Sequence, residues 1–201
     1  MCNARGAEGF VATSPETRRK FWLDRARTAA IAAHTNAFKI NEDVVIPLDR
    51  LGDYTDGVER INIELSIGNK LALCGALDAA LSEPFPPALW GAHAEELPPA
   101  ETLAAKLDEA QAVIAAVRTR WQDFLVRIDQ MFPTLQDHSV VVSWKTEIKA
   151  PLVDIFAGIA FAPVLKRCID VHREVLRARV FIALHMHAGD GNVHTNIPVN
   201  S

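Results

Sequence analysis

The most regular hydrophobic pattern in the chain runs through residues 103–131. Apolar side chains recur there at alternating spacings of four and three, which is the heptad spacing of a packed helix: Leu103, Leu107, Ala110, Ile114, Val117, Trp121, Phe124, Ile128 and Met131. An earlier helix is expected from about residue 49 to 81. Its seam is mostly small and would admit a close partner: Val58, Ile61, Leu65, Gly68, Ala72, Gly75, Ala76 and Ala79. Five prolines exclude a regular helix from residue 84 to 99, so the two helices are predicted to form a projecting antiparallel hairpin.

Shorter segments predict a small sheet. Residues 37–46 are rich in strand formers and are followed by Pro47, and residues 179–187 and 193–199 are two strands joined by the turn 188–192. Residues 8–13 are a further strand candidate. Ser14-Pro15-Glu16 predicts the start of a helix that runs to about residue 34.

The segment after the long helices is expected to be mainly helical. Residues 138–144 are either a short strand or the lead-in to a helix. Residues 145–177 are predicted as helix, with Pro151 near the start and Pro163 as a break or kink. The whole pattern predicts a helix-rich α+β fold with a small antiparallel sheet, covered by helices on one face.

Composition excludes several classes of protein. The net charge of −4 provides no basic surplus for binding nucleic acid. The three cysteines are odd in number and far apart, which argues against a disulfide framework or a thiolate zinc site and favours a reducing, cytoplasmic location. No apolar run reaches the roughly 18 residues of a membrane span. The chain is expected to be a fragment of a longer protein that continues beyond both termini.

Three of the seven histidines lie within ten positions, at His185, His187 and His194. A hairpin would bring His187 and His194 together, and imidazole is a good ligand for zinc and related metals. Two ligands are too few, so a third would come from elsewhere. His185 shares the strand face of His187 and is either a ligand or an orienting group. An ordinary tight turn flanked by histidines explains the same spacing.

The run HAGDGNVHTN at residues 187–196 resembles the signature of the C-terminal domain of FAD-linked oxidases. This family includes D-lactate dehydrogenases, the glycolate oxidase flavin subunit and D-2-hydroxyglutarate dehydrogenase. Residues 21–25 (FWLDR) are similar to the family's tryptophan–x–x–arginine helix, and residues 38–47 are similar to its lysine, then acid–valine–proline, strand. Beyond these motifs, the amino-acid sequence also resembles that of long bacterial proteins in which this flavoenzyme is fused to an iron–sulfur module.

The resemblance implies a partial ferredoxin-like cap domain over residues 1–201, in which residues 50–132 form a long helical hairpin insertion. It implies the substrate- and metal-binding part of an FAD-dependent dehydrogenase for a 2-hydroxy acid such as D-lactate or glycolate. The implied metal ligands, for zinc or another divalent metal, are His187 and His194. The implied substrate contacts are Arg25, Lys39 and Asn196. The implied flavin-facing residues are Gly189, Asp190, Gly191 and Asn192. A solvated charge at Arg25, an edge-strand lysine at Lys39 and an ordinary strand amide at Asn196 remain alternatives.

The family's flavin-binding domain has no counterpart in this sequence, and its glutamate ligand and histidine base are expected beyond Ser201. No catalytic residue is therefore expected within these 201 residues, and the isolated chain is expected to bind no flavin and to be inactive. Its expected partners are the 2-hydroxy acid and the FAD and iron–sulfur domains of the same protein, with a homodimer and a peripheral position at the inner membrane left open.

Two alternatives compete with the oxidoreductase hypothesis. One is a helical interaction module that docks through the 103–131 seam, and the other is a stand-alone metal-binding protein. Burial of that seam within the chain would argue against the first.

Overall fold

The computed structural model describes residues 11–28 and 38–199, without the side chains of residues 24–28, 38–39, 92–94 and 198–199. The chain divides into two compact units, residues 1–38 with 200–201 and residues 39–199. The first unit contains helix α1 (Pro15–Thr28). The second contains the remaining helices and almost all of the sheet.

Helix α1 begins as the sequence predicts. The Ser14 hydroxyl accepts a hydrogen bond from the Thr17 backbone N–H at 3.1 Å, and Pro15 is the first helical residue. The expected continuation to residue 34 lies mostly outside the described residues. The strand expected at residues 8–13 is wrong where it can be seen, because residues 11–13 belong to no element and residues 8–10 are outside the described part.

The sheet has the strand order β1-β3-β2, with β1 (Phe38–Val45), β2 (Ala183–His187) and β3 (Asn192–Val199). β2 and β3 form the predicted antiparallel hairpin. β1 approaches from a distant part of the chain, and its end is held where the Ile46 N–H donates to the Gly191 carbonyl at 2.8 Å. The strand predicted from residue 179 begins only at Ala183, since the Asn62 side chain binds both the N–H and the carbonyl of Ile182.

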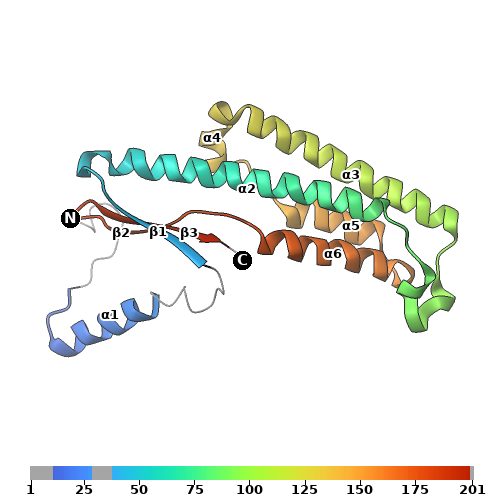
Figure 1. Ribbon diagram of the computed structural model, residues 1–201, viewed down its shortest axis with the longest axis horizontal. Helices are drawn as coiled ribbons and strands as arrows, with labels where there is room; N and C mark the ends of the chain where they lie inside the picture. Colours follow the sequence, from blue (N-terminus) through green and yellow to red (C-terminus); the bar gives the residue numbers. More distant parts are fainter. Residues whose placement is uncertain (1–10, 29–37, 200–201) are drawn as a thin grey trace. The chain divides into compact units, whose positions relative to one another are not determined.

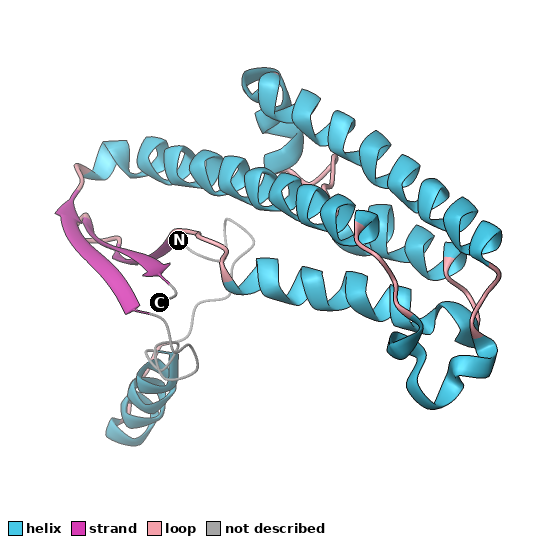
Figure 2. Cartoon of the chain, turned by 45° about the vertical axis from the view of Figure 1, so that its right-hand side comes forward, coloured by secondary structure: helices cyan, strands magenta, loops and turns pink. Residues whose placement is uncertain are grey.

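The helices between β1 and β2 pack into one body (Figures 1 and 2). Its long member is α2 (Leu51–Ser82), which follows the short η3 (Leu48–Arg50) and packs against α3 (Ala100–Val126), α4 (Ile128–Gln136) and α6 (Ala162–Arg177). The shorter elements are η4 (Pro87–Glu96), η5 (Lys145–Lys149), α5 (Ala150–Ile155) and η6 (Ile159–Phe161). α5 and η5 pack against α3.

The heptad seam of residues 103–131 is confirmed as a packing surface. Ala110, Ile114 and Trp121 are fully or almost fully buried, and the other six seam residues pack against the same core. α2 and α3 pack against each other, as the predicted hairpin requires. The pair does not project on its own, because the segment from η5 to α6 contributes Ile148, Leu152, Val164 and Cys168 and their neighbours to that core. The seam is therefore occupied within the chain, which removes the surface that a docking module would have used.

The predicted seam of α2 is also wrong in detail. Ile61, Ala72 and Ala79 are exposed, whereas the buried positions include Ile67, Leu73 and Leu77. α2 has helices on more than one side, so its buried residues do not follow a single stripe.

The segment 138–144 forms no strand and leads into η5, one of the two alternatives. The helix break expected at Pro163 falls slightly earlier, at Gly158, whose φ of 98° suits glycine. Pro163 instead lies in the first turn of α6. The described residues together confirm a helix-rich α+β fold with a three-stranded sheet. Among them no single helix is long and apolar enough to cross a membrane; the bent pair 145–155 with 159–177, which turns by 117°, passes the same test only by length and composition.

Candidate functional site

The β2–β3 hairpin gathers the predicted histidines on one face of the sheet. His185 is opposite His194 and His187 is opposite Asn192 in the register. Residues two apart on a strand, and residues directly opposite across a pair, share a face. The ring centroids of His187 and His194 are 5.6 Å apart, and His185 lies 5.8 Å from each of them. The expected convergence of His187 and His194 is therefore confirmed, and His185 belongs to the same cluster.

The opposite face of the hairpin contacts the beginning of α2. Val193 is completely buried, and the Thr195 hydroxyl is hydrogen-bonded to the Tyr54 hydroxyl of α2 at 2.8 Å. Further along α2, Asn62 exchanges two hydrogen bonds, of 2.7 and 2.8 Å, with the backbone of Ile182 just before β2. These contacts direct the apolar face toward α2 and leave the histidines on the other face.

The geometry of the turn between β2 and β3 explains why residue 191 is glycine. The Asp190 N–H donates to the His187 carbonyl at 2.9 Å, which closes a tight turn. Gly191 has a φ of 70°, and a Cβ atom there would lie 2.2 Å from the Ile46 carbonyl oxygen. Glycine is thus required by the approach of β1. Gly189 is exposed and has open space around its Cα, and its implied position facing the flavin stays a prediction.

Asp43 is the residue of this site that the sequence reasoning missed. It lies in β1, is separated from His194 by 151 residues, and places its Oδ1 atom 2.5 Å from His194 Nδ1. The sequence contains a sign of this residue, because the acid of the Asp43-Val44-Val45 run is part of the family resemblance. The resemblance implies no contact or chemical role for Asp43. Only the pairing of β1 with β3 reveals its neighbour.

The predicted substrate contacts have different outcomes. Asn196 lies opposite Ala183, on the histidine face, and its side-chain N–H group donates weakly to the His194 carbonyl at 3.4 Å. Lys39 belongs to β1 and Arg25 to α1, but both side chains are outside the described part. Their contacts with a carboxylate therefore stay predictions.

The catalytic base expected beyond Ser201 also stays a prediction. The description ends at residue 199, so Ser201 itself lies outside the described residues. Within the described part, the histidine face includes side chains of the hairpin and Asp43 of β1.

The metal site is incomplete in the part of the chain that the structure describes. No three His, Cys, Asp or Glu side chains there are arranged to hold a metal ion. His187 and His194 fit as two imidazole donors of a larger set, and the source of further ligands stays a prediction. The described residues do not form the closed site that a stand-alone metal-binding protein would need.

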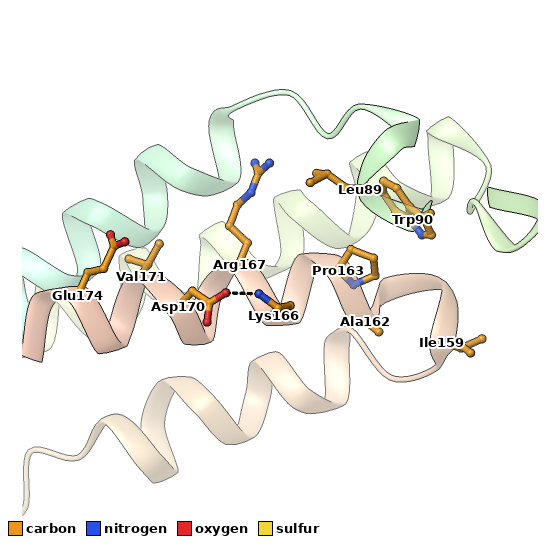
Figure 3. Close-up of a pocket in the computed structure, with 10 residues that line it drawn as sticks. All are labelled: Leu89, Trp90, Ile159, Ala162, Pro163, Lys166, Arg167, Asp170, Val171 and Glu174. Atoms are coloured by element: carbon orange, nitrogen blue, oxygen red, sulfur yellow. Dashed lines mark hydrogen bonds and ion pairs between the residues drawn. The ribbon is translucent and has the colours of Figure 1, made fainter. Parts of the chain in front are cut away.

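A hollow of about 670 Å³ lies between η4 and α6 (Figure 3). Trp90 and Pro163 form part of its wall, and Lys166 at its rim is paired with Asp170 at 2.6 Å. None of the predicted site residues is among those that line it. The chemistry therefore gathers at the hairpin and not in this hollow.

Comparison with known proteins gives one match, to a family model, over the first part of the chain. Residues 1–75 match the family model described as FAD linked oxidases, C-terminal domain. No curated protein and no solved structure matches the chain. The matched range contains α1 and β1, where two of the three resembling segments lie, and ends within α2; the histidine hairpin is outside it. The matched residues are thus similar to a domain of FAD-linked oxidases.

Proposed function

We propose, from the match of residues 1–75 to the family of FAD-linked oxidase C-terminal domains, that this chain is the substrate-facing part of a flavin-dependent 2-hydroxy-acid dehydrogenase. D-lactate and glycolate are among the smallest such acids. One observation carries the proposal: β1, which lies in the matched range, reaches the histidine hairpin through the contact of Asp43 with His194. This contact makes the hairpin, although outside the matched range, part of the same unit.

The polar face of the hairpin suits the chemistry of this substrate. A 2-hydroxy acid has a carboxylate and a neighbouring hydroxyl. Arg25 and Lys39 are the proposed partners of the carboxylate, since guanidinium and ammonium groups bind it by charge-assisted hydrogen bonds. Asn196 is the proposed hydrogen-bonding partner of the substrate beside the histidines. When bound, the flavin accepts the hydride from the carbon that bears the hydroxyl.

His187 and His194 are the proposed protein ligands of a divalent metal, zinc being the best match to imidazole donors. Such a metal would bind the substrate hydroxyl and orient it. The remaining ligands, the base expected beyond Ser201 and the flavin site are proposed to come from other regions of a longer protein. An iron–sulfur module in that protein stays a prediction.

The test uses this chain together with its flanking coding regions. The purified protein should contain flavin and reduce an artificial dye when supplied with a 2-hydroxy acid. His187→Ala and His194→Ala should each lower that rate by roughly 100-fold or more, because metal-site groups are worth at least this much. His138→Asn is the matched control: His138 is exposed and has a φ of 62°, which asparagine tolerates. Absence of flavin, or undiminished oxidation in both alanine variants, would contradict the proposal.

A further inference from the structure

We propose that Asp43 is a positioning residue that fixes His194 in the tautomer with its proton on Nδ1. In this tautomer, Nε2 of His194 is the nitrogen available to the metal or substrate. Only this role of the tautomer rests on the proposed function. The arrangement of the two side chains is a property of this chain.

The argument begins with the hydrogen bond itself. Oδ1 of Asp43 and Nδ1 of His194 are 2.5 Å apart, which is short even for a charge-assisted bond. An ionised carboxylate can only accept hydrogen bonds, so Nδ1 of His194 must carry the proton. In neutral imidazole the other nitrogen, Nε2, then has the lone pair. The carboxylate therefore selects which nitrogen can act as a ligand or base.

No other described side chain competes for that nitrogen. The His185 and His187 rings lie 5.8 and 5.6 Å from the His194 ring between centroids, without a hydrogen bond to it. Asn196 donates to the backbone carbonyl of His194 and not to its ring. The His194 side chain is 26% exposed, so water can reach it only in part.

The sheet maintains the distance between the two groups. β1 is adjacent to β3, and the Ile46–Gly191 hydrogen bond anchors the end of β1 close to Asp43. Side chains alternate along a strand, so the neighbouring Glu42 extends to the other face. Orientation of a histidine by a carboxylate on its second nitrogen is a recurrent arrangement, and removal of the carboxylate allows the wrong tautomer.

The test is a long-range ¹H–¹⁵N correlation spectrum of the whole 201-residue chain, labelled at histidine and recorded at about pH 8. His194 is expected to be mainly in the Nδ1–H form. Asp43→Ala should reduce this preference by roughly tenfold, because a hydrogen bond to a charged group is lost. Glu42→Ala, which removes the adjacent carboxylate of the same strand, should leave it unchanged.

Three results would overturn the inference: an Nε2–H form of His194 in the unsubstituted chain, an unchanged tautomer in Asp43→Ala, or an equal change in Glu42→Ala. If Asp43→Ala does not fold, the spectrum of the unsubstituted chain still decides the tautomer. In the flavin-containing protein, Asp43→Ala should lower dye-linked oxidation by roughly 10- to 100-fold, with Glu42→Ala unaffected. A correct tautomer in a protein that oxidises no 2-hydroxy acid would refute the proposed function alone.

Discussion

Replacement of Gly191 by alanine probes the junction between the hairpin and β1. This residue has a φ of 70°, and a new Cβ atom would lie 2.2 Å from the Ile46 carbonyl oxygen. Nothing flexible can absorb this collision, because the nearest atom belongs to the backbone. The substitution must therefore rotate the Gly191 backbone or separate the end of β1 from the turn.

The expected cost combines two destabilising contributions and one that opposes them. A residue with a Cβ atom destabilises the folded state by about 1–2 kcal/mol when its backbone lies in the left-handed region. Displacement of β1 also loses the 2.8 Å hydrogen bond between Ile46 and Gly191, worth about 0.5–1.5 kcal/mol. The unfolded chain becomes less flexible with alanine, which returns about 0.4–1 kcal/mol. We expect a net loss of about 2 kcal/mol in the free energy of unfolding.

Urea unfolding followed by circular dichroism measures this loss. Gly189→Ala is the matched control in the same turn, since open space surrounds Gly189 and its φ is not positive. It should change the free energy of unfolding by less than about 0.5 kcal/mol. Equal midpoints for the two variants would refute the reasoning.

Three further predictions concern the helical body and its attachment to the sheet. Trp121→Ala should cost about 3–5 kcal/mol in urea unfolding, because the indole is completely buried; a loss below about 1 kcal/mol would contradict the described core. Asn62→Ala should cost about 1–3 kcal/mol and accelerate amide exchange just before β2, since it leaves a backbone N–H and carbonyl unpaired. Burial raises the pKa of the Cys74 and Cys168 thiols to about 11, so both should resist iodoacetamide at about pH 8 until urea is added, as mass spectrometry can establish. Stability should fall as pH rises from about 9 to 11, because unfolded thiols ionise first.

The two long helices show what a sequence pattern can and cannot predict. The heptad seam around Ile114 and Trp121 was correct because large apolar side chains repeated at the helical period against polar neighbours. The seam through Ala72 and Ala79 was wrong because α2 packs against several helices. Its true core residues, such as Leu73, do not form a single stripe. Partners that are distant in sequence leave no periodic signal.

The candidate site divides in the same way. The grouping of His187 and His194 was predictable, since a tight turn and strand alternation fix it locally. The role of Asp43 was not, because its contact depends on the order of strands in the sheet. The turn that contains Gly191 was predicted from the local sequence, but the Ile46 carbonyl that requires glycine there lies just after the distant β1. Non-local pairing supplied the information that local patterns lack.

The insertion of the helical body between β1 and the hairpin has a consequence for the order of folding. Joining residues that are 151 positions apart costs a flexible chain about 4 kcal/mol in loop-closure entropy. A helical body that folds first shortens this loop, since α2 begins just after β1 and Asn62 holds the chain just before β2. We therefore expect the helices to gain amide protection before the β1–β3 pair. A substitution deep among the helices could then abolish the histidine cluster while every residue of that cluster remained unchanged.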